Sequence, residues 1–312
     1  MTSLPKSINH VQVPPIKIQG IKSDLVGFIA ANINWDGDGR WVEPFLGSGV
    51  VLFNIEPERA LIADANKHII NLYQQIQSGE ITGLVVREFL NKHGAELEEQ
   101  GEDYYYEMRE RFNKNQEPLF MLFLNRSCYN GMMRFNRSGG FNVPFCKKPE
   151  RFRQAYVTRI VNQVEEVAKI IEGKDWEFKT WDWRDTLAET ADDDFIYFDP
   201  PYVGRNTGYI GEWEEDEAAE LAETSQQLDA GYAMSMWSDN QYRENEHIDE
   251  YWSDHVIRTH SHFYHVGSTE DLRNEMNEAL LIKNGCEAPK DVVAKIAGDE
   301  THQATLNDVT ED

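Results

Sequence analysis

The residues that most directly suggest chemistry are Asp199, Pro200, Pro201 and Tyr202, which follow a short apolar run at 195–198. Such a run is typical of a buried strand in a parallel sheet, and α/β proteins bind ligands where these strands end. An exocyclic amine conjugated with an aromatic ring is a poor nucleophile. If Asp199 and the Pro200 carbonyl accept its two hydrogens, the electron density on its nitrogen rises. The prolines would fix this turn, and Tyr202 would offer a face on which an extruded base can stack.

A second motif lies near the N-terminus, where a strand-like segment at 41–45 runs into Leu-Gly-Ser-Gly and then a helix-like start. Gly47 and Gly49 allow a ligand to approach the backbone closely, and a helix N-terminus offers free N–H groups. Asp64 ends the next predicted strand, where a carboxylate can accept both hydroxyls of a ribose. The third glycine of the dinucleotide fingerprint is missing, which favours a mononucleoside such as S-adenosylmethionine.

The elements that must position these motifs alternate in a way that predicts an α/β sheet. Strand-like runs at 41–45, 60–63, 195–198, 232–236 and 279–282 are separated by amphipathic segments. The segment between the second and third of these runs is mostly helical in pattern. We therefore predict a discontinuous, Rossmann-like catalytic domain over 1–66 and 156–284, an inserted, mostly helical recognition domain with a β-hairpin over 67–155, and a poorly ordered acidic tail over 285–312.

The charge of the chain is distributed unevenly. The 312 residues carry a formal net charge of −25, which taken globally disfavours a polyanionic partner. Within 121–160, however, there are eight basic side chains and one acidic side chain. This window is compatible with a local polyanion-binding surface and equally, on charge alone, with a solvated helix face.

Other features of the composition narrow the class of protein. The apolar runs are far shorter than the roughly 20 residues that span a bilayer, and no secretory leader follows Met1. Cys128, Cys146 and Cys286 are neither a disulfide framework nor a zinc motif. We expect a reduced, cytoplasmic protein without a metal, and monomeric action is the simplest expectation.

Three groups of residues resemble the DNA adenine methyltransferases of the Dam class. The first is the Glu-Pro-Phe-x-Gly-x-Gly turn at 43–49, the second is Asp64 with Asn-Leu-Tyr at 71–73, and the third is the motif at 199–202. The most specific resemblance is to the DNA-reading hairpin of that family, over 125–136 and 140–145. The resemblance covers about residues 14–284.

The resemblance implies S-adenosylmethionine as the cofactor and assigns residues to its site. The segment 17–22 matches a family segment that touches the cofactor, although Ile18 and Ile21 replace its tryptophan and second glycine. An acidic position against the adenine of the cofactor matches Asp185, with Asp182 as a rival. The implied cofactor residues are Lys17, Gly20, Glu43, Phe45, Gly47, Gly49, Asp64 and Asp185.

The resemblance also implies double-stranded DNA as the partner. Arg134 matches a residue that reads guanine, a role in keeping with the bidentate grip of arginine on that base. Tyr129 and Asn130 match residues that wedge into the duplex. The remaining implied contacts are Met132 and Pro144 on base edges, and Arg126, Arg137 and Lys147 on phosphates. A glycine-rich segment at 203–213 could form a lid.

The leading hypothesis is therefore a site-specific adenine methyltransferase acting on a flipped base, with GATC suggested by the hairpin. Two alternatives stay open. One is methylation of another amine, in RNA adenine, cytosine or protein glutamine, although Asp199 favours adenine. The other is a catalytically idle DNA-binding decoy, suggested by the acidic composition and the altered 17–22 segment.

Overall fold

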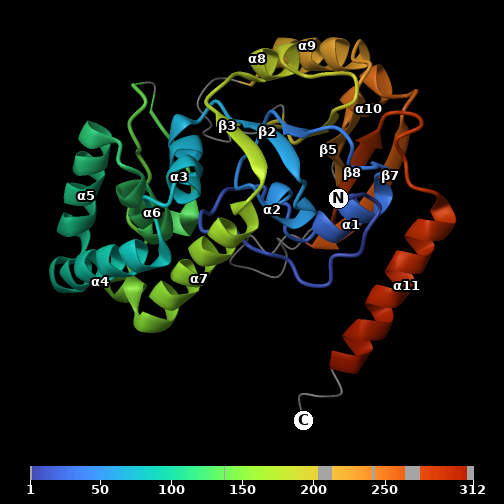
Figure 1. Cartoon of the computed structure of the whole chain (residues 1–312). Coiled ribbons are helices and arrows are strands. Elements are labelled where there is room, and N and C mark those ends of the chain that lie inside the picture. Colours follow the sequence, from blue (N-terminus) through green and yellow to red (C-terminus); the bar gives the residue numbers. More distant parts are fainter. Residues whose placement is uncertain (1, 137, 203–212, 241–242, 264–274, 308–312) are drawn as a thin grey trace.

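The computed structural model describes all residues except 1, 137, 203–212, 241–242, 264–274 and 308–312 (Figure 1). At its centre lies one sheet in the order β3-β2-β1-β4-β5-β8-β7, with β6 paired to β5. The Rossmann-like α/β class predicted from the sequence is confirmed. The strands are β1 (Trp41–Glu43), β2 (Arg59–Ala63), β3 (Asp175–Lys179), β4 (Phe195–Phe198), β5 (Gly231–Asn240), β6 (Arg243–Glu244), β7 (Val256–Phe263) and β8 (Glu275–Ile282).

Strand direction determines which motifs meet. Strands β1 to β5 are parallel, whereas β8 is antiparallel to both β5 and β7. The carboxyl ends of β1, β2 and β4 therefore lie at one edge of the sheet. The glycine turn, Asp64 and Asp199 follow these three ends and are brought together, although they are far apart in sequence.

Helices cover both faces of the sheet. One apolar cluster joins β1, β2 and β4 to α1 (Val26–Asn32) and α2 (Leu52–Ile55). A second cluster on the other face packs Val42, Leu61 and Phe198 against α8 (Trp183–Ala188), α9 (Glu215–Gln226) and α10 (Glu246–Tyr251). Figure 1 shows α8 and α9 together on one side of the sheet, opposite α2. Both faces of the central strands are thus buried, as their apolar sequences require.

The segment between β2 and β3 is helical, as predicted. It contains α3 (Lys67–Gln77), α4 (Gly83–Gln100), α5 (Glu102–Asn115), α6 (Pro118–Ser127), two 3₁₀ turns (Tyr129–Gly131 and Pro149–Phe152) and α7 (Gln154–Ile171). Its apolar residues join the first cluster of the sheet without a break. Helix α3 is tied directly to β3, because Gln74 and Gln77 donate to the Phe178 and Trp176 carbonyls at 2.8 and 2.9 Å. Helix α3 therefore packs directly against the sheet. The domain boundary at residue 67 stays a prediction.

Part of the predicted acidic tail is helical, as α11 (Lys290–Asn307), and the expectation that the tail is poorly ordered stays a prediction. The Ala288 N–H donates to the Asn32 carbonyl at 2.8 Å, and Ala288 is fully buried. This anchor precedes Pro289, whose carbonyl accepts from Val292 and Val293 in the first helical turn. A proline next to the first helical residue is a common signal for a helix start. Figure 1 shows α11 leading away from the sheet.

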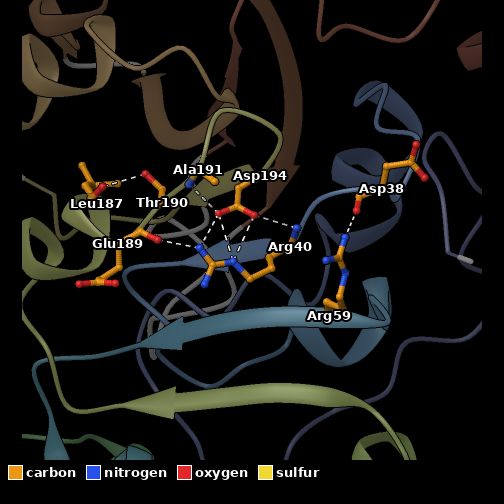
Figure 2. A network of polar contacts seen from close by, with 8 residues as sticks. All are labelled: Asp38, Arg40, Arg59, Leu187, Glu189, Thr190, Ala191 and Asp194. Atoms are coloured by element: carbon orange, nitrogen blue, oxygen red, sulfur yellow. Dashed lines mark hydrogen bonds and ion pairs between the residues drawn. The ribbon is translucent and has the colours of Figure 1, made fainter.

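A polar network fixes the opposite, amino-terminal edge of the sheet (Figure 2). The Asp194 carboxylate accepts from the Arg40 backbone N–H at 2.8 Å and from its guanidinium at 2.7 Å. The guanidinium also donates to the Glu189 carbonyl at 2.6 Å. Because Arg40 precedes β1 and Asp194 precedes β4, this network aligns two central strands from the edge that lies away from the motifs.

Candidate active site

A cavity of about 190 Å³ lies at the carboxyl edge of the sheet, and we call it the main cavity. The predicted site residues Gly20, Glu43, Phe45, Gly47, Asp64, Asp199 and Pro201 all line it. Further lining residues include Ile18, Ile21, Lys22, Asn66, Asp182, Trp183, Tyr197 and Trp213. The structure therefore brings the two sequence motifs into one cavity. The proposed lid segment, except Trp213, lies outside the described residues.

The glycine turn forms one wall of the main cavity. Gly47 and Gly49 have φ values of +54° and +77°, a region that side chains disfavour. A Cβ on Gly47 would meet nothing within 4 Å, whereas one on Gly49 would lie 2.5 Å from the Phe53 ring. Gly47 thus leaves open space for a ligand, and Gly49, which does not line the cavity, allows the turn to pack on α2.

Asp64 is held against this turn. Its carboxylate accepts from the Gly47 N–H at 2.9 Å and from the Asn66 N–H at 2.7 Å. Burial raises the pKa of Asp64 to about 6, and these two hydrogen bonds oppose the rise. At neutral pH Asp64 is therefore mostly ionised, and it can accept hydrogen bonds from a ligand.

Glu43 lines the same cavity, but its protonation state at neutral pH differs from that of Asp64. Its side chain is 2% exposed and accepts a hydrogen bond from Trp41 Nε1 at 2.8 Å. Burial raises its pKa to about 8, opposed by the Trp41 bond and supported by the nearby Asp199 charge. Glu43 is mostly neutral at pH 7, so the cavity holds a carboxyl that a bound cation would cause to ionise.

Asp199 forms an ion pair that the sequence did not predict. Lys22 Nζ lies 2.8 Å from Asp199 Oδ1 and also donates to the Gly20 carbonyl at 3.1 Å. The lysine side chain is 5% exposed and that of Asp199 26% exposed. Burial raises the pKa of Asp199 and Lys22 opposes it, whereas Asp199 holds the pKa of Lys22 well above its usual value against the effect of burial. Asp199 is thus paired with a charged lysine, and part of its side chain is still accessible.

The two other described residues of the catalytic motif do not line the cavity. Pro200 is buried, and Tyr202 is half-buried. The Tyr202 hydroxyl donates to Glu278 Oε2 at 2.7 Å, and Lys22 Nζ lies 5.0 Å from the centre of its ring. Sequence reasoning missed Glu278. Its only signal is a lone acid immediately before the apolar run at 279–282, which the predicted strand left out.

Besides Gly49, two predicted cofactor residues lie outside the main cavity. Asp185 is exposed in the first turn of α8, whereas its rival Asp182 lines the cavity and caps that helix by accepting from the Arg184 N–H at 3.0 Å. Lys17 is directed elsewhere because Asn125 of α6 binds both its backbone N–H and its carbonyl, each at 2.8 Å. Of the two rival aspartates only Asp182 lines the main cavity, and the cofactor roles of Asp185 and Lys17 stay predictions.

Lys17 instead lines a second cavity of about 310 Å³, which we call the basic cavity. Arg126, Arg159 and Asn130 also line it, and no acidic residue does. Burial, together with the charges of Arg126, Arg151 and Arg159, lowers the pKa of Lys17 to about 8. Ile18 and Ile21 line both cavities, so the segment 17–22 is a wall shared between them.

Arg126 differs from our expectation of a surface phosphate contact. It is 2% exposed, its guanidinium donates to the Pro15 carbonyl at 3.1 Å, and it lies over the Tyr156 ring at 4.9 Å. Its Nε has no hydrogen-bond partner among the described residues. Arg126 therefore faces the basic cavity and not the outer surface. Charge pattern alone could not reveal this burial.

The predicted hairpin residues largely reach the surface. Residues 134–142 fold back on themselves, with the Asn142 N–H donating to the Arg134 carbonyl at 3.1 Å. Tyr129 is 54% exposed, and Phe141, Val143 and Phe145 anchor the hairpin in the core. Among the predicted DNA contacts of this region, Met132 is half-buried and Arg137 lies outside the described residues. The exposed ones are Tyr129, Asn130, Arg134, Pro144 and Lys147.

The described residues hold neither a metal-ion cluster nor a membrane-spanning helix. Among the described residues, no group of three or more His, Cys, Asp or Glu side chains could hold a metal ion. No helix within that part of the chain is long and apolar enough to cross a membrane.

Comparison with known proteins identifies the family. A sequence profile of the D12 class N6 adenine-specific DNA methyltransferases matches residues 19–268, and the chain belongs to this family. It is 36% identical over 167 residues to a DNA adenine methylase of Serratia marcescens, covering 52% of this chain and 57% of that protein. It is 30% identical over 257 residues to the type II methyltransferase M.MjaIII of Methanocaldococcus jannaschii, covering 73% and 84%. The family expected from the sequence is confirmed.

The extent of these matches differs between relatives. The DNA adenine methylase of Escherichia coli K12 is 32% identical over 170 residues, covering 52% of this chain and 55% of that one. The chain thus spans little more than half the length of these methylases. A solved rRNA methyltransferase, aviRa of Streptomyces viridochromogenes, is similar at 13% identity with a TM-score of 0.30, covering 80% of this chain and 78% of that one, a score too low to bear on fold or substrate.

Proposed function

We propose that this protein transfers a methyl group from S-adenosylmethionine to the exocyclic amine of an adenine flipped out of duplex DNA. The observation that carries the proposal is the position of Asp199. It ends β4 beside the glycine turn and Asp64, in one cavity, in a chain of the adenine-specific DNA methyltransferase family. The residues that would bind the nucleoside of the cofactor and the carboxylate that would accept a hydrogen bond from the amine thus lie in one site.

The residues of the main cavity fit the cofactor. The open space above Gly47 admits a ligand against the backbone, and the Asp64 carboxylate can accept from ribose hydroxyls. Glu43 offers a buried carboxyl that ionises near a cation. When bound, the sulfonium supplies an electrophilic methyl group that requires neither a metal nor a covalent enzyme intermediate.

Asp199 and the Pro200 carbonyl would act on the acceptor amine. Each would accept a hydrogen bond from one N–H of the amine, which orients the nitrogen and increases its electron density. Burial raises the pKa of Asp199, and the ion pair with Lys22 opposes this rise and so favours the ionised form. Tyr202 would stack on the extruded base, as aromatic side chains do in enzymes that act on flipped bases.

The exposed hairpin would bind the duplex. Arg134 and Tyr129 project from a loop whose apolar residues are fixed in the core, so they can reach a groove without moving the fold. Lys147 is exposed nearby, and the basic cavity gathers further positive charge next to Asn130. GATC remains the expected target, and we expect a monomer acting in the cytoplasm, where bacterial or phage DNA is found.

The decisive experiment incubates unmethylated plasmid DNA with the purified protein and S-adenosylmethionine, and maps the modified bases by direct sequencing. Methyladenine confined to GATC supports the chemistry and the target together. Methyladenine in another motif supports the chemistry and contradicts the target. Absence of methyladenine contradicts the proposal. RNA would then be tested as the acceptor, and a cofactor titration without binding would indicate the decoy.

The matched variant for this assay is Asp199→Asn. It removes the charge but keeps the shape, so it disturbs the fold less than alanine beside the buried Lys22. We expect methyl transfer to fall by at least about 100-fold while DNA affinity changes little. Loss of both together, in a folded variant, would contradict the role of Asp199.

A further inference from the structure

Glu278 is a buried carboxylate in a position where a strand normally holds an apolar residue. It lies in β8, between Trp237 of β5 and His260 of β7 in register, and it is 3% exposed. Ala279, Leu280 and Leu281 follow it in the core. Burying a carboxylate in a central strand is unfavourable unless it has strong partners. Its partners therefore indicate why this position is acidic.

Both described partners belong to the candidate active site. The Tyr202 hydroxyl donates to Glu278 Oε2 at 2.7 Å. Lys22 lies close enough for Glu278, together with Asp199 and Tyr202, to raise its pKa. Glu278 is buried and does not line the main cavity, so we assign it a role through the side chain that it holds, Tyr202.

We propose that Glu278 is a positioning residue for methyl transfer, which fixes Tyr202 through the hydrogen bond from its hydroxyl. This inference rests on the proposed function. The hydrogen bond ties the stacking ring to a buried strand of the sheet.

The test compares Glu278→Ala and Glu278→Gln with wild type in single-turnover methyl transfer. Alanine removes both the acceptor and the charge, and we expect the rate to fall about tenfold or more, with the affinities for S-adenosylmethionine and DNA within about twofold of wild type. Glutamine keeps an acceptor for Tyr202 and should recover part of the rate. If the alanine variant does not fold, the glutamine variant alone is the test: a rate below wild type supports the positioning role, and a wild-type rate contradicts it.

Asp194→Asn is the matched control. Asp194 is also a buried, ion-paired carboxylate that borders a strand of the same sheet, but it lies at the opposite edge (Figure 2). We expect this variant to lose stability without losing rate per folded molecule. If it slows transfer as much as Glu278→Ala does, or if Glu278→Ala transfers at the wild-type rate, the positioning role is wrong.

A second readout separates this inference from the proposed function. DNA with 2-aminopurine at the target position fluoresces more when the base leaves the duplex and less when it stacks on Tyr202. We expect a brighter complex with Glu278→Ala than with wild type, and an intermediate one with Glu278→Gln. A wild-type protein that transfers no methyl group would overturn the proposed function, whereas equal fluorescence of all three complexes would overturn the role of Glu278.

Discussion

At the scale of single residues, the main cavity combines carboxyl groups in different protonation states. Asp64 is hydrogen-bonded to two backbone N–H groups and has a pKa of about 6, whereas Glu43 has one indole donor and a pKa of about 8. Burial raises both values; two backbone donors oppose the rise at Asp64, whereas at Glu43 one indole donor opposes it and the charge of Asp199 adds to it. One carboxyl is therefore ready to accept hydrogen bonds, and the other is a neutral group that responds to a cation.

This difference predicts a pH dependence of cofactor binding. Glu43 is protonated in the free protein at pH 7, and a bound sulfonium favours its ionised form, so binding releases a proton. Affinity for S-adenosylmethionine should therefore rise, by at most about tenfold per pH unit, until pH passes about 8. Calorimetric titrations between pH 6.5 and 8.5, in buffers of different ionisation enthalpy, measure both the affinity and the released proton.

The control for this prediction is Glu43→Gln, which keeps an acceptor for Trp41 Nε1 but cannot ionise. The titration of the cofactor's own amino group is common to both proteins and cancels in the comparison. The variant should lose the rise in affinity between pH 7 and 8. The same pH profile in both proteins would show that Glu43 does not sense the bound cation.

At the scale of elements, the glycine turn between β1 and α2 depends on packing as well as on backbone freedom. A Cβ at position 49 would combine a disfavoured φ of +77° with a 2.5 Å approach to Phe53. We expect Gly49→Ala to lower the free energy of unfolding by about 2 kcal/mol or more and to weaken cofactor binding. Denaturant unfolding and a cofactor titration measure the two effects.

Gly79 provides a control with the same backbone strain. Its φ is +79°, but a Cβ there would meet nothing within 4 Å. Gly79→Ala should cost only about 1 kcal/mol and leave cofactor binding unchanged. Equal losses in the two variants would mean that the Phe53 contact contributes nothing.

Elements also show what the sequence can and cannot predict. The strand before Asp199 and the turn at Gly47 were predicted because their signals are local: an apolar run, then turn residues. Lys22 and Glu278 were missed because their roles come from contacts between segments up to 177 positions apart in the chain. The position of Lys17 in the second cavity was not foreseen for the same reason, since its backbone is bound by Asn125 of a distant helix.

At the scale of the whole molecule, strong acidity coexists with a basic binding surface. The net charge of −25 repels DNA in general, while eight basic side chains fall within 121–160. Of these, Arg126 is buried towards the basic cavity, and Arg134 and Lys147 are exposed. If the protein binds DNA as proposed, the basic side chains of 121–160 would supply the attraction, so binding should depend strongly both on salt and on the correct orientation.

Two substitutions on this surface should separate attraction from recognition. Lys147→Ala removes one phosphate contact, so it should weaken binding to all duplexes alike and reduce the slope of log affinity against log salt by about 1. Arg134→Ala should cost about 1–3 kcal/mol on the target site and much less on other sequences, because guanine contact supplies discrimination. Fluorescence titrations of target and scrambled duplexes at several salt concentrations measure both. The opposite pattern, with discrimination lost at Lys147 and retained at Arg134, would show that the hairpin approaches DNA in a different orientation.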